Sequence, residues 1–105
     1  MVNEVKLIGN LGRDPQVKNF DSGKTAARIS IACNEYYNGQ TKTTWVDVLA
    51  WGKVAKNMEK SLRKGDQIYV DGKLSVHVYD REGEQRKVME VVANGFRRLN
   101  PRKEE

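Results

Sequence analysis

Apolar side chains recur at every second position along several long stretches of this chain. In residues 67–79 the even-numbered positions from Ile68 to Val78 are apolar except for Gly72, and the odd-numbered ones are polar or aromatic. Side chains on a β-strand alternate between its two faces, so this period predicts a strand with one buried face. Gly72 interrupts the apolar face and is typical of a sharp bend in a long strand. Similar patterns predict strands at residues 3–11, 25–36, 43–52 and 85–99, with a short strand-like piece at 16–20.

One segment breaks this pattern. Between residues 53 and 64, four apolar residues from Val54 to Leu62 fall on one stripe, which predicts a short helix. Gly65 follows it and is a natural helix C-cap. The dipeptide at residues 38–39 is Asn-Gly, the strongest hairpin signal in the chain, and residues 80–84 are expected to form a second hairpin loop.

The order of the long elements is three strands, one helix and two strands. A helix between the third and fourth strands of a five-stranded, all-antiparallel chain predicts an OB-fold, a five-stranded, partly open Greek-key barrel. The fold class is therefore all-β with one short helix. We expect residues 1–99 to form this single domain and residues 100–105 a short polar C-terminal extension. In the last strand we expect Met89, Val91 and Ala93 to face inward.

The charge balance restricts the class of partner. The chain has 105 residues, with 19 Lys and Arg against 14 Asp and Glu, and a formal net charge of +5. Such a balance favours polyanions, either nucleic acid or an anionic membrane surface. No run of about eighteen apolar residues could span a membrane, and no signal peptide or transit segment is visible, so we expect a cytoplasmic protein. The only cysteine, Cys33, excludes an intrachain disulfide and a cysteine-based zinc site, and we expect it to be buried.

Two tryptophans give the strongest indication of function. Trp45 and Trp51 are six residues apart on a predicted strand, so both indoles lie on one face, opposite apolar residues of positions 46–50. In a basic protein, outward aromatics on a strand favour stacking on the bases of single-stranded nucleic acid. Two alternatives stay open: the indoles could line the core, or they could face a partner subunit.

Several motifs resemble the bacterial single-stranded DNA-binding protein family (SSB). They occur in the family's order along nearly the whole chain: IGNLGRDP at 8–15, SG at 22–23, ARISIA at 27–32, NE at 34–35, TW at 44–45, AWGK at 50–53 with Ala55, LRKG at 62–65 and YVDGKL at 69–74. The resemblance implies an OB-fold, no catalysis, and usually a homotetramer. The sequence itself has no phosphate-binding loop, nucleophile motif or metal-ligand cluster, so we expect no cofactor and no metal. It also implies binding of single-stranded DNA with little sequence specificity, during replication, recombination and repair.

The resemblance assigns roles to individual residues. Carried over by position, the stacking residues are Tyr37, Trp45, Trp51 and Tyr79, and Tyr36 is expected to pack instead. Lys53 and Lys64 match basic positions that could contact phosphates. Further candidates for phosphate contact are Lys24, Lys42, Lys73, Arg86 and Lys87. Each of these cations taken alone is better explained as a solvated surface charge, and the expectation concerns their collective effect on salt dependence.

The chain also departs from the family pattern. Many relatives have His-Arg where this chain has Val46-Asp47, and the Asp47 carboxylate would repel phosphates unless it is paired. Ser75 and His77 stand where many relatives have arginines, and His77 lacks a second ligand set for a metal role. The family usually ends in an acidic tail that recruits repair enzymes; here the sequence stops at residue 105, which makes that recruitment doubtful. Either the chain has been trimmed from a longer protein, or it is a naturally short form that protects DNA without recruiting those enzymes.

Rival functions come from three other classes. The first is a primosomal or other replication-partner OB-fold protein, in which protein contacts matter as much as DNA. The second is an RNA-binding OB module, and the third and least favoured is an enzyme. With single-stranded DNA as the partner, the expected location is cytoplasmic and nucleoid-associated.

Overall fold

The computed structural model describes residues 1–101, apart from the side chain of Tyr79. These residues form β1 (Val5–Leu11), β2 (Gln16–Asn19), β3 (Thr25–Tyr37), β4 (Gln40–Trp51), α1 (Gly52–Ser61), β5 (Gln67–Arg81) and β6 (Glu84–Arg98). Within this described part, α1 falls short of the length and apolar character that a membrane-spanning helix needs.

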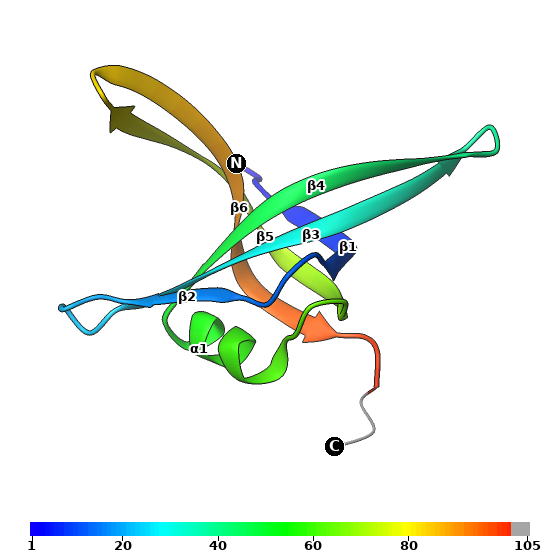
Figure 1. Ribbon diagram of the computed structural model, residues 1–105, viewed down its shortest axis with the longest axis horizontal. Coiled ribbons are helices and arrows are strands. Elements are labelled where there is room, and N and C mark those ends of the chain that lie inside the picture. Colours follow the sequence, from blue (N-terminus) through cyan, green and yellow to red (C-terminus); the bar gives the residue numbers. More distant parts are fainter. Residues whose placement is uncertain (102–105) are drawn as a thin grey trace.

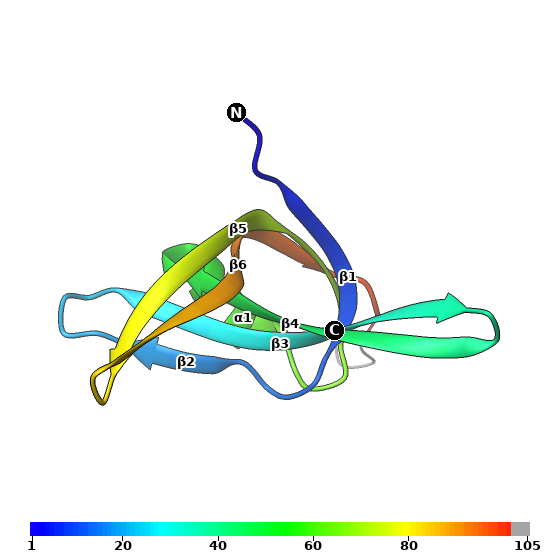
Figure 2. The ribbon, with the colours of Figure 1, turned by 90° about the horizontal axis from the view of Figure 1, so that it is seen from above.

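Five strands close into a barrel. The hydrogen-bonded order is β1-β5-β6-β4-β3-β2, and β1 also pairs with β3, so the ring β1-β5-β6-β4-β3 returns to its start (Figures 1 and 2). The short strand β2 pairs only with β3, outside this ring. The OB-fold prediction is confirmed.

One feature of the predicted topology is wrong. Strands β4 and β6 run parallel, with Val48 opposite Val91 and Leu49 opposite Val92, whereas the sequence predicted an all-antiparallel arrangement. Parallel neighbours need a crossover connection, and here α1 and β5 lie between the two strands in the chain. Hairpin signals reveal only neighbours in sequence, so this contact had no local signature.

The barrel interior holds the core. The faces predicted to point inward on β3 and the first half of β5 are buried, including Ile29, Ile31, Ile68 and Val70, each at most 2% exposed. Burial of such a side chain stabilises the fold by about 1.5–3 kcal/mol. Cys33 is only half-buried at the edge of this cluster, and burial raises the pKa of its thiol.

Helix α1 covers one end of the barrel (Figure 1). Its predicted stripe is confirmed, because Ala55, Met58 and the following Leu62 are fully buried. The helix ends at Ser61, earlier than predicted, since Leu62 adopts an extended backbone with φ −105° and ψ 144°. Gly65 is therefore not the C-cap; it lies in the next turn, where its N–H donates to the Leu11 carbonyl at 2.8 Å.

Two hairpins extend beyond the barrel as arms. The β3–β4 arm turns at Asn38-Gly39 and the β5–β6 arm at Glu82-Gly83, and all four residues have positive φ. The Asn-Gly signal is thus confirmed as a two-residue turn. The β5–β6 arm and the β2–β3 turn extend to one side of the molecule, and the β3–β4 arm extends to the other (Figures 1 and 2).

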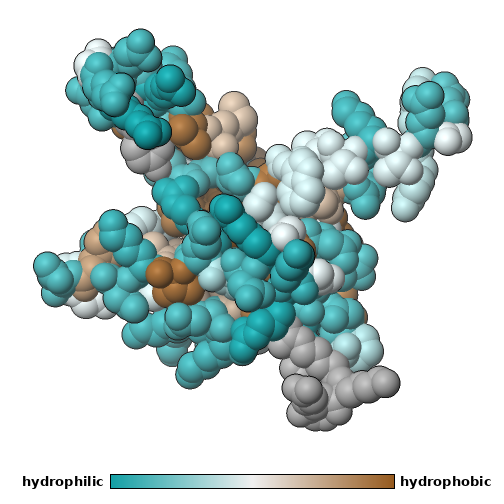
Figure 3. Space-filling view, in the orientation of Figure 1, coloured by the Kyte–Doolittle hydropathy of each residue, from teal (hydrophilic) through white to brown (hydrophobic). Residues whose placement is uncertain are grey.

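The arms overturn part of the predicted core. Met89 was expected inward but is 64% exposed, and three apolar residues on the same face of the β5–β6 arm are also exposed: Leu74, Val76 and Val78. Their alternation continues that of the core, yet the strands have left the barrel at this point, so no second layer covers them. Apolar surface is visible where this arm leaves the barrel (Figure 3).

The bend expected at Gly72 is present as a register shift between Asp71 and Gly72 in the β5–β6 ladder. A Cβ at Gly72 would overlap the Val92 carbonyl oxygen and lie 3.0 Å from Val91 Cγ1. Only a glycine lets the two backbones approach this closely.

Gly72→Ala should lower the free energy of unfolding by about 1–3 kcal/mol, because the backbones must separate to admit the methyl group. Urea denaturation followed by circular dichroism measures this change. Gly95→Ala is the matched control, since Gly95 lies opposite Asp71 in the same ladder and its added Cβ would meet no atom within 4 Å. Equal stability of the two variants would show that the close approach does not constrain the barrel.

Candidate nucleic-acid interface

The outer face of β4 carries both tryptophans. Trp45 is 60% exposed and Trp51 is 45% exposed, whereas Val48 and Ala50 on the opposite face are buried. Neither indole belongs to the core, which removes one of the alternatives left open by the sequence. Leu49 also lies between the tryptophans on the outer face and is only 3% exposed, whereas Asp47 on the same face is exposed.

Trp45 is positioned by a glycine. A Cβ at Gly12 would lie 2.7 Å from Cζ3 and 2.9 Å from Cη2 of the indole. The Gly12 N–H donates to the Ser30 carbonyl at 3.0 Å, which fixes this part of the backbone against β3. The six-membered ring of the indole therefore lies directly against Gly12, the residue that follows β1.

Trp51 lies between two hollows. It ends β4 and is the N-cap residue of α1. One hollow, of about 410 Å³, brings together the predicted phosphate contacts Lys24 and Lys53, together with Lys56, which the sequence analysis did not single out. The second, of about 320 Å³, is lined on its other side by β2 and β3. An aromatic ring beside several cations suits a stacked base with a neighbouring phosphate.

Phe20 is an aromatic residue that sequence reasoning missed. Its ring stacks on Trp51, with centroids 5.9 Å apart and an interplanar angle of 27°. The Lys18 Nζ lies 5.0 Å from the centroid of the Phe20 ring, within the range of a cation–π contact. The signal was the strand-like piece at 16–20, where period two places Lys18 and Phe20 on one face.

The β3–β4 arm carries Tyr37 near its tip. Tyr37 is 73% exposed and shares a hollow with Lys42, which lies opposite Glu35 in the ladder. Tyr36 was expected to pack but is 81% exposed, so that expectation is wrong. The arm has no second sheet beside it to receive a packing side chain.

The β5–β6 arm places the remaining candidates on two faces. Tyr79 lies opposite Arg86, but its side chain is outside the described part of the structure. Arg86 Nη2 is 3.8 Å from Glu84 Oε2. Lys87 lies opposite Val78 and so points to the other face of the arm. Lys73 is exposed in the barrel part of β5, opposite Val92, which also pairs with Leu49 of β4.

Lys64 does not join the residues around Trp51. It follows α1 in an exposed turn, and its N–H donates to Asp14 Oδ1 at 2.8 Å, which ties this turn to the one between β1 and β2. Asp47 is exposed on the tryptophan face, as its position in the strand predicted. The structure thus gathers Lys24 and Lys53 at Trp51. The other predicted cations lie on the two arms, in the barrel part of β5 or in the turn after α1.

A buried carboxylate lies on the outer face of the sheet. Glu90 is 2% exposed, and its Oε2 accepts a hydrogen bond from Arg28 Nη1 at 2.9 Å. Its Oε1 is 3.0 Å from His77 Nε2. A buried charge is costly unless it is paired, so Arg28 and His77 offset the cost of burying Glu90 and are themselves held against the face.

A family model matches nearly the whole chain. The model is described as the single-strand binding protein family, and it covers residues 2–99. The chain belongs to this family. A single-stranded DNA-binding protein of Bacteroides thetaiotaomicron is 34% identical over 109 residues, which cover 96% of this chain and 68% of that protein. The family resemblance predicted from the motifs is confirmed.

In this member of the single-strand binding protein family, Gly12→Ala should displace the Trp45 indole, because the methyl group would occupy its place. In a Trp51→Phe background, where Trp45 is the remaining tryptophan, the emission maximum should shift to longer wavelength as the indole becomes more hydrated. The free energy of unfolding should fall by about 1–3 kcal/mol. Gly95→Ala again serves as control, and an unchanged emission maximum in the Gly12 variant would contradict the contact.

Proposed function

We propose that this protein binds single-stranded DNA with little sequence specificity and protects it during replication, recombination and repair. The observation that carries this proposal is the pair of exposed tryptophans on the outer face of β4, with cations gathered beside Trp51. The family to which the chain belongs and its Bacteroides relative are both named for single-strand binding. A cytoplasmic, nucleoid-associated location accompanies this proposal.

Two interactions contribute to the binding free energy: aromatic stacking on bases and neutralisation of phosphates by lysines. Stacking of a base on Trp45 or Trp51 contributes about 1–3 kcal/mol and tolerates any base, because every base has a π-face. Lysines such as Lys24 and Lys53 neutralise phosphates and release counterions, which makes affinity depend on salt. Tyr37 and Tyr79 extend the stacking surface onto the two arms. We propose no bond-making step, no cofactor and no metal.

Titration with oligo-dT should quench tryptophan fluorescence strongly, and duplex DNA of the same length should not. Trp45→Leu and Trp51→Leu should each lower the affinity by about 5- to 150-fold, the equivalent of one lost stack. Raising the salt concentration should weaken binding of the single strand. These measurements need only the wild-type protein and two variants whose thermal unfolding is checked first.

Absence of quenching by oligo-dT at low salt would contradict the proposal. The indoles would then face a protein, and the replication-partner function would gain support. The family match does not favour that alternative. An RNA oligomer of equal length, titrated at the same salt concentration, separates a DNA-binding from an RNA-binding function.

We further propose that the chains form a homo-oligomer, most simply the tetramer that the resemblance implies. The support is the apolar face of the β5–β6 arm, where Leu74, Val76, Val78 and Met89 are 43–64% exposed. A contiguous apolar surface of this kind marks an interaction site. A second copy of the chain could cover it face to face, and linked subunits would bind a long strand with higher avidity.

Leu74→Glu should reduce the number of subunits, because a carboxylate would be buried in the proposed contact. Leu99→Glu is the matched control, since the two leucines are exposed to nearly the same extent, 43% and 42%, and Leu99 lies beyond the end of β6. Light scattering coupled to size-exclusion chromatography gives the subunit count. A monomeric wild-type protein, or equal counts for both variants, would contradict the proposed surface.

A further inference from the structure

The second hollow beside Trp51 is a groove built across three strands. In the ladders, Lys18 lies opposite Ala26, and Ala26 lies opposite Trp51. The neighbouring row consists of Gln16, Arg28 and Leu49. Ala26 and Leu49 are buried, at 7% and 3% exposed, and form the floor. The groove exists because the middle residue of the first row is small.

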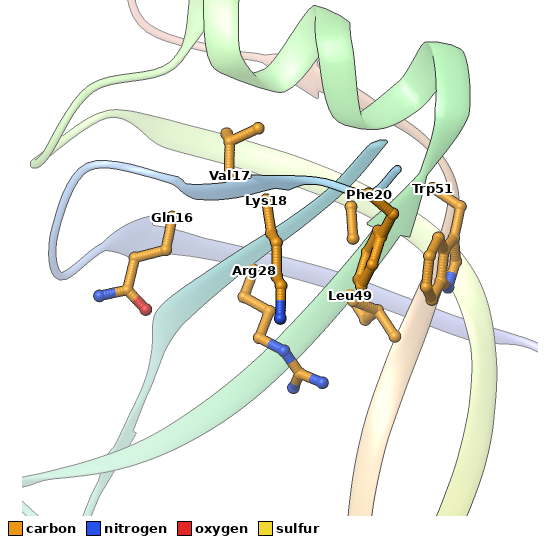
Figure 4. Close-up of a pocket in the computed structure, with 8 residues that line it drawn as sticks. Gln16, Val17, Lys18, Phe20, Arg28, Leu49 and Trp51 are labelled. Carbon is orange, nitrogen blue, oxygen red and sulfur yellow. The ribbon is translucent and has the colours of Figure 1, made fainter. Parts of the chain in front are cut away.

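The walls of the groove combine an aromatic surface with cations. Phe20 and Trp51 project side by side into the hollow, and Lys18 and Arg28 lie next to them (Figure 4). The stacked rings form one apolar wall, and both remain partly exposed, at 37% and 45%. The hollow measures about 320 Å³, within the usual range for ligand sites.

The groove is held rigidly from both sides. The Phe20 N–H donates to the Lys24 carbonyl at 2.8 Å, and the Phe20 carbonyl accepts from the Gly23 N–H at 2.9 Å. On the other side, Arg28 is fixed by its 2.9 Å hydrogen bond to the buried Glu90. A rigid wall loses little conformational entropy when a ligand binds to it, which favours binding.

We propose that this groove is a nucleotide subsite, in which a base stacks against the wall of Phe20 and Trp51 while Lys18 contacts a phosphate. It continues the path of the strand past Trp51, from the hollow of Lys24 and Lys53 toward β2. The inference rests on the proposed binding of single-stranded DNA and adds β2 to the contact surface. Under this proposal, Lys18 on β2 and Phe20 directly after it both contact DNA.

Four variants test the aromatic wall, the floor and the phosphate contact of the subsite separately. Phe20→Leu removes half of the aromatic wall and should lower the affinity for oligo-dT by about fivefold or more, whereas Phe20→Tyr, which keeps the ring, should restore it. Ala26→Leu fills the floor without changing charge or aromatics and should lower the affinity similarly. Lys18→Gln should reduce the slope of log K against log salt by about 0.7, the share of one phosphate on a single strand.

The controls separate the subsite from general effects. Lys60→Gln removes an exposed charge on α1 that lines neither hollow beside Trp51, and it should leave the salt slope closer to that of the wild type. Arg28 is left intact, because its loss would strand the buried Glu90 and destabilise the fold. Thermal unfolding of each variant checks that the protein still folds. If the larger side chain in Ala26→Leu prevents folding, Phe20→Leu alone tests the groove.

The outcomes distinguish this inference from the proposed function. Wild-type affinity and salt slope in Phe20→Leu and Lys18→Gln, with a loss in Trp51→Leu, would overturn the subsite and leave single-strand binding intact. Failure of the wild-type protein to bind oligo-dT would overturn both. Loss of affinity in Phe20→Leu, recovery in Phe20→Tyr and a lower salt slope in Lys18→Gln would together establish the subsite.

Discussion

The structure depends on two antiparallel ladders that are longer than the barrel they build. Strands β3 and β4 have 13 and 12 residues, and β5 and β6 have 15 each, against about 5–6 for a typical strand. Strict alternation along such a ladder gives an inner and an outer face. Inside the barrel the inner face becomes core, while beyond it the same face meets solvent. One backbone pattern thereby produces both a stable domain and two exposed arms.

The sequence pattern predicted correctly those features that depend only on residues close together in the chain. The outward position of Trp45 and Trp51, the Asn-Gly turn and the bend at Gly72 all follow from alternation or from backbone conformation, and the structure has each of them. The position where the barrel ends is set by neighbours distant in sequence, so Met89 and Tyr36 were placed wrongly. The parallel contact of β4 with β6 and the stacking of Phe20 on Trp51 had no local signature for the same reason.

The buried carboxylate of Glu90 fixes the positions of two neighbouring basic side chains on the outer face. A sheet surface of this size could present scattered cations, but here one anion at its centre holds Arg28 from β3 and His77 from β5. Outside this cluster, Asp47 is exposed on the same face, and Lys18 on β2 and Lys24 and Lys53 border the hollows around Trp51. Glu90 therefore holds Arg28 and His77 against the sheet, while lysines border the hollows on both sides of Trp51.

The place of Trp51 at the junction of β4 and α1 has a consequence for the order of events in binding. Its backbone is restrained by the ladder before it and by the helix after it, and its ring is restrained by Phe20. Tyr37 lies beside a two-residue turn at the end of an arm and is 73% exposed. DNA that reaches Trp51 contacts a side chain whose conformational entropy was already lost during folding. Contact with Tyr37 must still restrict a mobile side chain, which costs conformational entropy on binding. We therefore expect DNA to bind first at Trp51, at the junction of β4 and α1, and then to extend to Tyr37 at the tip of the arm.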